Sequence, residues 1–238
     1  MQFRTIDLDH YARREHFDYF KGLPYPYVGI TTNVDASAVL HFSKQYNRSF
    51  YLSFLHAVAL AADSVPELRQ RIHGNQIIEY SECPTSHIEL LEDRSYCYCT
   101  LFHHMPFDAY YDQAEKARAA CRNNGIHEDE NVESMYFISA LPWVHYTALI
   151  QPVAGGEESN PRITWGKYEE MPDGKIEIPV SVLAHHALVD GIHIARFYDC
   201  LNAEIQKFDD LDPGTEKTTG EINRDHTALK RKYGTTNP

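Results

Sequence analysis

The sequence has few basic residues, and this shortage excludes one class of partner. Lysine and arginine number 22 against 34 aspartate and glutamate residues, which gives a formal net charge of −12. Nucleic-acid binding needs clustered cations that neutralise phosphates. We therefore expect no nucleic-acid partner, and any anionic ligand has to bind at a local basic patch.

Long apolar runs are also missing. No stretch reaches the roughly 18 uncharged apolar residues that a membrane helix needs. The first twenty residues include seven charged side chains, so they lack the apolar core of a signal peptide. We predict a protein that has no membrane partner and resides in the cytoplasm.

Cysteines are few, odd in number and irregularly spaced, which predicts no disulfide framework and fits a reducing compartment. They are Cys83, Cys97, Cys99, Cys121 and Cys200. Cys97 and Cys99 followed by His103 and His104 suggest zinc, but the usual two-residue spacer between zinc-binding cysteines is absent. Strand packing or pocket lining is the preferred interpretation of these four residues.

The chain lacks internal repeats, and its apolar content suffices for one core. Hydrophobic residues make up 43% of 238 residues. We predict a single domain over 1–208. Residues 209–238 contain few large apolar groups, so burial cannot offset their ordering entropy, and we predict a loosely held polar extension.

Apolar periodicity and β-branched runs predict alternating helices and strands, and hence a mixed α/β fold. Met171-Pro-Asp-Gly has the composition of a hairpin turn. The predicted helices cover 9–20, 36–45, 50–62, 109–123 and 192–208. The predicted strands cover 3–7, 28–34, 77–80, 87–91, 96–102, 136–139, 145–150, 162–168 and 175–184.

The segment with the clearest chemistry is an apolar strand that ends in two adjacent histidines, His185 and His186, followed by Asp190-Gly191. Neighbouring side chains on a strand face opposite sides, so only one histidine can address a given pocket. A neutral imidazole can accept a proton near neutral pH and return it later. The same divergence argues against a metal site built from this pair and His193.

This motif resembles the signature of the chloramphenicol acetyltransferases, His-His-x-x-x-Asp-Gly, which usually continues Phe-His-x-x-Arg. The shorter motif is shared with condensation domains and dihydrolipoyl acyltransferases, but the chain lacks the second half-domain or the lipoyl segments that these contain. Four other segments resemble the acetyltransferases in order and spacing, and the similarity spans 1 to about 208. They are Arg13-Arg-Glu-His-Phe, Pro66-Glu-Leu-Arg, Ile138-Ser-Ala-Leu-Pro-Trp-Val and Ile163-Thr-Trp-Gly-Lys-Tyr.

The resemblance implies a fold and an activity. The fold is an α/β structure of the α+β two-layer sandwich type, a mixed β-sheet covered by helices. The activity is acetyl transfer from acetyl-CoA, the co-substrate, to a hydroxyl of chloramphenicol or a related small-molecule alcohol acceptor, without a metal. The assembly is a homotrimer with active sites between subunits.

The resemblance also assigns catalytic roles. His186 is the general base, and Ser139 donates to the oxyanion of the tetrahedral intermediate. Thr164 steadies the same intermediate through water. Asp190 and Arg13 form an ion pair that fixes the loop of the base. From the residues alone, Ser139 as a turn cap and Arg13 as a solvated helix residue remain alternatives.

Binding roles follow in the same way. Trp143, Lys167 and Tyr51 match positions that contact coenzyme A. In the acceptor region Phe20 stands where many members have tyrosine, and Tyr27 is a candidate pocket wall. Because this region departs from the family pattern, a catalytically idle relative that binds ligands is the alternative hypothesis.

Overall fold

The computed structural model describes residues 1–91, 95–124 and 131–213. Its helices are α1 (Arg14–Lys21), α2 (Ser37–Gln45), α3 (Phe50–Asp63), α4 (Phe107–Asn124) and α5 (Gly191–Gln206), with 3-10 turns at Leu8–His10, Pro66–Arg69, Val132–Ser134 and Lys207–Asp209. Its strands are β1 (Phe3–Thr5), β2 (Tyr27–Asp35), β3 (Gln70–His73), β4 (Gln76–Tyr80), β5 (Thr85–Leu90), β6 (Tyr96–Leu101), β7 (Tyr136–Ala140), β8 (Arg162–Trp165), β9 (Glu169–Glu170) and β10 (Ile176–His185).

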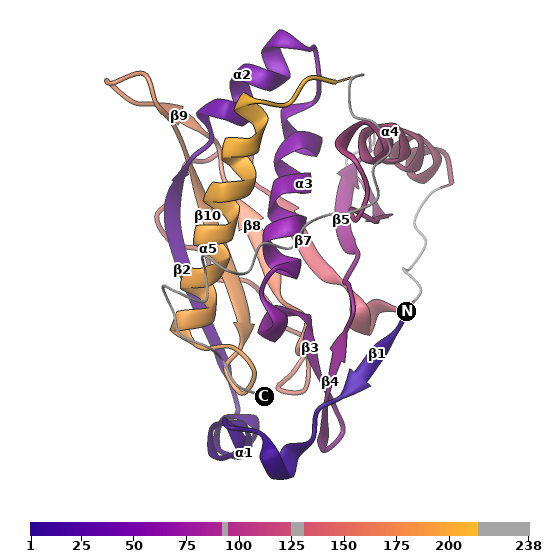
Figure 1. Ribbon diagram of the computed structural model, residues 1–238, viewed down its shortest axis with the longest axis vertical. Coiled ribbons are helices and arrows are strands. Elements are labelled where there is room, and N and C mark those ends of the chain that lie inside the picture. Colours follow the sequence, from indigo (N-terminus) through magenta and orange to yellow (C-terminus); the bar gives the residue numbers. More distant parts are fainter. Residues whose placement is uncertain (92–94, 125–130, 214–238) are drawn as a thin grey trace.

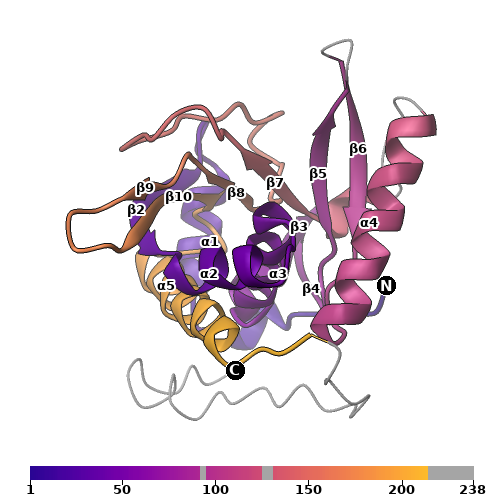
Figure 2. The ribbon, with the colours of Figure 1, turned by 90° about the horizontal axis from the view of Figure 1, so that it is seen from above.

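One large mixed sheet organises the chain, in the order β2-β10-β8-β7-β5-β6, with β9 paired to β10. The pairs β5–β7 and β7–β8 are parallel, and the other pairs are antiparallel. Helices α2, α3, α4 and α5 lie on one side of this sheet (Figure 2), and β1, β4 and β3 form a smaller sheet beside it (Figure 1). The predicted mixed sheet covered by helices is confirmed.

Helix α3 is the centre of the core, as its apolar sequence predicts. Eleven of its 14 residues are buried, and the Ser49 side chain accepts a hydrogen bond from the Leu52 backbone N–H at its start. Phe208, just after α5, packs edge-on against Phe42 and Phe107. Among the helices that the structure describes, none has an apolar run long enough to cross a bilayer.

Several predicted elements differ from the structure: the strand predicted over 162–168 ends at Trp165, and β3 was not predicted. The helix predicted over 9–20 begins only at Arg14, after a 3-10 turn in which the Asp9 N–H donates to the Asp7 side chain over 3.0 Å. The strand predicted over 145–150 is wrong, because the segment forms no ladder and is held by side chains, with the Tyr146 hydroxyl donating to the Thr164 carbonyl over 2.9 Å. The predicted extension from 209 falls almost entirely outside the described residues.

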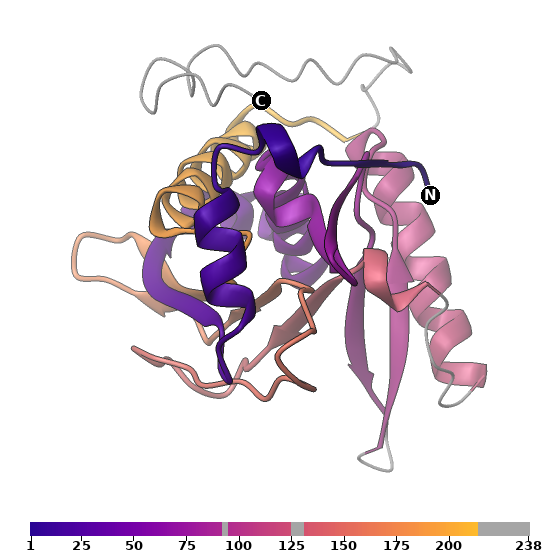
Figure 3. The same ribbon diagram turned by 90° about the horizontal axis from the view of Figure 1, so that it is seen from below.

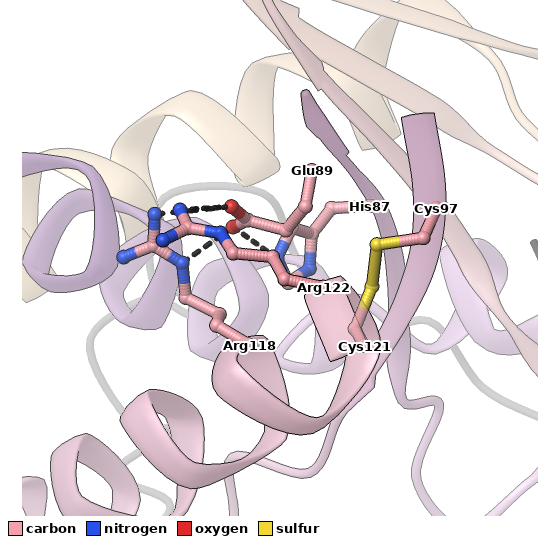
Figure 4. The surroundings of a disulfide bond; sticks show 6 residues. All are labelled: His87, Glu89, Cys97, Arg118, Cys121 and Arg122. Carbon is pink, nitrogen blue, oxygen red and sulfur yellow. Dashed lines mark hydrogen bonds and ion pairs between the residues drawn. A yellow bond between two sulfur atoms is a disulfide. The ribbon is translucent and has the colours of Figure 1, made fainter. Parts of the chain in front are cut away.

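The prediction that the cysteines form no disulfide is wrong for one pair. Cys97 on β6 and Cys121 on α4 are bonded, with Cα atoms 6.1 Å apart (Figure 4). Cys83, Cys99 and Cys200 are free and buried. Cysteine number and spacing do not reveal this pair, because only the packing of α4 on the β5–β6 hairpin brings the two residues together.

A buried carboxylate beside the disulfide also holds α4 against β5 and β6. Glu89 on β5 accepts hydrogen bonds from Arg118 and from Arg122, the latter over 2.6 Å, and lies 3.3 Å from the Nε2 atom of His87 (Figure 4). Burial alone would raise the pKa of Glu89, but these hydrogen bonds lower it to about 2. Helix α4 is therefore held on β5 and β6 both covalently and by charge.

Loss of the disulfide is expected to destabilise the fold. The two cysteines are 24 residues apart, so the Cys97→Ala variant should lose about 3 kcal/mol of unfolding free energy through the freed chain entropy of the denatured state. Denaturant titrations with and without a thiol reductant measure this loss. The reductant should lower wild-type stability to that of the variant and leave the variant unchanged, and an unaffected wild type would contradict the bond.

Candidate active site

His186 lies just beyond the end of β10, where its backbone N–H donates to the Pro26 carbonyl over 2.7 Å. Its Nδ1 atom lies 2.9 Å from the Val189 carbonyl, and its half-buried ring lies against the Phe20 ring with centroids 3.9 Å apart. A carbonyl only accepts hydrogen bonds, so Nδ1 carries the proton in the neutral ring. The lone pair is then on Nε2, which is the atom that can take a proton from a ligand.

His185 has a different environment from its neighbour. The ring is buried, and it stacks edge-on against Tyr27 at 5.4 Å. Its Nε2–H donates to the Gly156 carbonyl over 3.0 Å, and its Nδ1 accepts from the Ala187 N–H over 3.2 Å. Both ring nitrogens are thus used within the fold, which leaves none for a substrate.

Arg13 and Asp190 flank the loop that carries His186. Their nearest charged atoms are 3.8 Å apart, and Arg13 also donates to the Leu188 carbonyl, two residues after His186. The Asp190 carboxylate caps α5 by accepting from the Gly191 N–H over 2.6 Å. Burial alone would raise the pKa of Asp190, but this hydrogen bond and the Arg13 charge lower it. The predicted pair therefore occurs, and it can fix the loop.

His193 completes the start of α5 as a neutral residue. Its ring is buried, and its Nδ1 accepts from the Asp190 N–H over 2.9 Å. Burial and the nearby Arg13 and Arg196 charges lower the pKa of His193 to about 3, and these outweigh the Glu67 carboxylate, which lies 3.6 Å from its Nε2 atom. The folded state consequently resists protonation of this ring, while the unfolded chain protonates near pH 6.5.

The His193 contribution predicts acid sensitivity. Because the folded pKa is depressed, the unfolded state binds more protons below pH 6.5, so stability falls as pH falls from there toward 3. Between pH 7 and pH 5 the wild type should lose about 2 kcal/mol more unfolding free energy than His193→Gln. Urea titrations at both pH values measure the difference, and equal losses in both proteins would refute the assignment.

Ser139 and Thr164 are side-by-side partners on the parallel strands β7 and β8. Both line a pocket of about 490 Å³, together with apolar residues such as Ile88 and Tyr98 and the side chain of Gln151. Thr164 Oγ1 accepts from the Gln151 amide over 2.8 Å, which leaves the threonine hydroxyl hydrogen to donate elsewhere. The sequence does not predict Gln151, because no local pattern marks a residue that an irregular loop brings to the site.

His186 and the serine–threonine pair are far apart within one chain. Thr164 on β8 is the register partner of Ser181 on β10. His186 follows Ser181 by five residues, a displacement of about 16 Å along an extended strand. A single copy of the chain therefore does not bring Ser139 and His186 to the same reacting atom.

Trp143 and Lys167 come from segments that touch. The Lys167 N–H donates to the Val144 carbonyl over 2.8 Å, and Trp143 is 70% exposed. Gly166 permits this approach, because a Cβ atom there would lie 2.7 Å from the Val144 carbonyl oxygen. The two residues can thus form part of one exposed binding surface.

Tyr51 lies elsewhere. Its ring packs against Trp165 and His87, with centroids 5.4 and 5.6 Å apart, and burial raises its pKa. Trp165 directly follows Thr164 on β8, so their side chains face opposite sides of the sheet. Tyr51 is therefore on the helix-covered side and not in the pocket of Thr164.

Phe20 packs against His186, whereas Tyr27 packs against His185. Phe20, near the end of α1, covers the His186 ring. The Tyr27 hydroxyl donates to the Glu158 carbonyl over 2.8 Å and also contacts the Gly155 carbonyl. Burial, aided by the Glu158 charge, raises the pKa of Tyr27 to about 12, so its hydroxyl stays protonated.

Helix α1, which carries Phe20, crosses the end of the molecule where β2 begins (Figure 3).

Comparison of the whole sequence with protein families identifies the relationship. The family model described as chloramphenicol acetyltransferase matches residues 1–202. The chain belongs to the chloramphenicol acetyltransferase family. The resemblance inferred from the His-His-x-x-x-Asp-Gly motif is confirmed, and with it the prediction that the protein is an acyltransferase.

Individual members of the chloramphenicol acetyltransferase family agree in length as well. A chloramphenicol acetyltransferase of Klebsiella sp is 27% identical over 213 residues, covering 87% of this chain and 94% of the relative. One from Bacillus pumilus is 26% identical over 215 residues, covering 87% and 96%.

Known structures confirm the fold. A chloramphenicol acetyltransferase superposes with a TM-score of 0.77 at 23% identity, covering 86% of this chain and 100% of the other. The truncated catalytic core of a 2-oxoacid dehydrogenase multienzyme complex from Thermoplasma acidophilum has a TM-score of 0.60 at 17% identity, covering 87% and 97%. The fold is thus common to two groups of proteins.

Proposed function

We propose that the protein transfers the acetyl group of acetyl-CoA to a hydroxyl of chloramphenicol or a related small molecule, with His186 as the general base. The observation that carries this proposal is the hydrogen bond from His186 Nδ1 to the Val189 carbonyl. It keeps the proton on Nδ1 and the lone pair on Nε2 in the neutral ring. Family membership supplies the reaction class.

The proposed reaction has two stages. His186 Nε2 removes the proton of the acceptor hydroxyl while the oxygen attacks the thioester carbonyl. The Ser139 hydroxyl donates to the oxyanion that forms, and Thr164 supports it through water. Collapse of the intermediate breaks the carbon–sulfur bond, and the coenzyme A thiolate takes the proton back from His186.

The site is proposed to be completed between copies of the chain in a homotrimer. The separation of about 16 Å along β10 argues that the base of one subunit serves the Ser139 pocket of the next. Exposed apolar side chains support a buried contact near that pocket: Ile30 on the edge strand β2 is 39% exposed and Ile150 is 93% exposed. A heterologous interface of this kind can close into a ring.

Substrate binding is assigned from the same surroundings. Trp143 and the Lys167 ammonium are proposed to contact coenzyme A, where a lysine can bind a phosphate. Phe20 and Tyr27 are proposed to form walls beside the base. Tyr51 stays a proposed coenzyme A contact, and its ring packs against Trp165 on the helix-covered side of the sheet.

The direct test mixes the purified protein with acetyl-CoA, chloramphenicol and a thiol reagent. Thiol release that depends on chloramphenicol and is lowered about a hundredfold or more in His186→Ala supports the proposal. Release with other hydroxyl compounds but not with chloramphenicol would restrict it to a different acceptor. Tight coenzyme A binding with no release across a broad alcohol panel would overturn it in favour of a catalytically idle relative.

A further inference from the structure

A second cluster of reactive side chains lies on the helix-covered side of the sheet. It consists of Asp63, the last residue of α3, and His103 and His104 in the connection between β6 and α4. One ligand atom from each residue lies within 4.8 Å of the others. The side chains of Asp63 and His103 are each 2% exposed, and that of His104 is 18% exposed. The cluster plays no part in the proposed acyl transfer.

The two histidines converge, although adjacent residues on a strand diverge. The chain leaves β6 at Leu101 and bends, with the Met105 N–H donating to the His103 carbonyl over 2.8 Å. This bend places the two imidazole centroids 4.7 Å apart and aims both Nε2 atoms at the same Asp63 carboxylate oxygen. The His103 Nε2 atom is 3.2 Å from that oxygen. Two ligands on one tetrahedral zinc ion are about 3.3 Å apart, so the His103 distance already suits an ion, whereas His104 Nε2, at 2.5 Å from the oxygen, has to draw back to admit one.

The charge of the cluster favours a cation. The other Asp63 oxygen accepts from the Tyr136 hydroxyl over 2.7 Å and from the Cys83 N–H over 3.2 Å. Within the described part of the chain, no lysine or arginine pairs with the Asp63 carboxylate. When His103 and His104 are neutral, this buried negative charge is therefore balanced by no positive charge. Such burial is costly, and the carboxylate also stands at a helix C-terminus, where negative charge is unfavourable.

We propose that Asp63, His103 and His104 bind one divalent transition-metal ion of the zinc type. Two imidazole nitrogens and one carboxylate oxygen suit Zn²⁺ or Co²⁺, whereas Mg²⁺ and Ca²⁺ prefer oxygen ligands throughout. His104 is the partly exposed ligand, so its side offers the route of entry and the remaining coordination position. The ion would tie the end of α3 to the connection before α4.

The site differs from the zinc arrangement that the sequence suggests. Cys97 is committed to its disulfide with Cys121, which removes it from any set with Cys99, His103 and His104. Asp63 takes its place from a position about forty residues earlier in the chain. Sequence spacing cannot reveal a ligand that only the packing of α3 against this connection supplies.

Metal titration of the full-length protein tests the proposal without any activity assay. The protein is treated with a chelator, dialysed, and titrated with Zn²⁺ by calorimetry and with Co²⁺ by visible absorption. We expect one ion per chain, a Co²⁺ spectrum typical of a four-coordinate nitrogen and oxygen site, and a raised Tm in Zn²⁺. His104→Gln removes a direct ligand, so it should weaken Zn²⁺ binding by at least about a hundredfold and sharply reduce the Tm increase at a fixed Zn²⁺ concentration.

A matched control separates this site from ordinary surface binding. His10 on the exposed N-terminal turn also pairs with a carboxylate, that of Asp7 at 2.7 Å, but among the described residues it belongs to no three-residue cluster of metal ligands. His10→Gln should therefore bind Zn²⁺ like the wild type. Absence of stoichiometric uptake, or equal affinity in His104→Gln with its circular dichroism unchanged, would overturn the metal site and leave the proposed acyl transfer untouched.

Discussion

Replacement of His186 by alanine is expected to lower kcat for acetyl transfer by about 10²- to 10⁴-fold, the range in which a general base contributes. The ring is half-buried at a strand end and its Nδ1 is hydrogen-bonded to the Val189 carbonyl. The adjacent His185 cannot replace it, because both of its ring nitrogens are occupied within the fold. The acceptor hydroxyl would then have to lose its proton to water.

Steady-state kinetics with acetyl-CoA and an accepted alcohol measure this effect. His186→Gln is the matched variant, since its amide can still donate toward the Val189 carbonyl but cannot accept a proton in the reaction. Both variants should lose kcat while the KM for acetyl-CoA changes by no more than about threefold, because the base acts in the transition state. Retention of most of the wild-type kcat in both would remove His186 from the mechanism.

Replacement of Ser139 by alanine is expected to lower kcat by about 10²- to 10³-fold, the cost of deleting one oxyanion donor. Ser139 lies in the 490 Å³ pocket beside its strand partner Thr164. Thr164→Val should have a smaller effect, since its hydroxyl is proposed to act through water. A larger loss in Thr164→Val than in Ser139→Ala would reverse the two roles.

Mixing the His186→Ala and Ser139→Ala variants tests whether the base and the oxyanion donor come from different subunits. If each site takes His186 from one subunit and Ser139 from its neighbour, co-refolded trimers of His186→Ala and Ser139→Ala contain intact sites. When equal amounts of the two variants assemble at random, about a quarter of the sites should be intact, and activity should be about a quarter of the wild-type value. Activity equal to the sum of the separate variants would instead place base and oxyanion donor in one chain.

Elements dominated by local sequence are the ones that can be predicted. The apolar run at Phe50–Asp63 forms α3, and Met171-Pro-Asp-Gly forms the turn before β10, where Gly174 has a φ of +85° that favours glycine. The position of His186 at a strand end also follows from its motif. These features depend on neighbours in the chain, so the sequence shows them directly.

Features that depend on distant partners could not be predicted in the same way. Residues 145–150 have the composition of a strand, but they run outside the ladders because the parallel pairing of β7 with β8 leaves no place between these strands. The Cys97–Cys121 bond and the approach of Asp63 to His103 likewise arise from helix packing. The side of the sheet on which Tyr51 lies, against Trp165, also depends on packing and does not follow from its position in the sequence.

The contact between His186 and the Val189 carbonyl has a consequence for how this protein can evolve. A main-chain oxygen sets the tautomer of the ring, and exchanging one side chain for another does not delete a main-chain oxygen. Mutations that reshape the acceptor walls around Phe20 can therefore accumulate while the proton-accepting atom keeps its identity. New alcohol preferences can arise on this scaffold without a stage at which the basic nitrogen is lost.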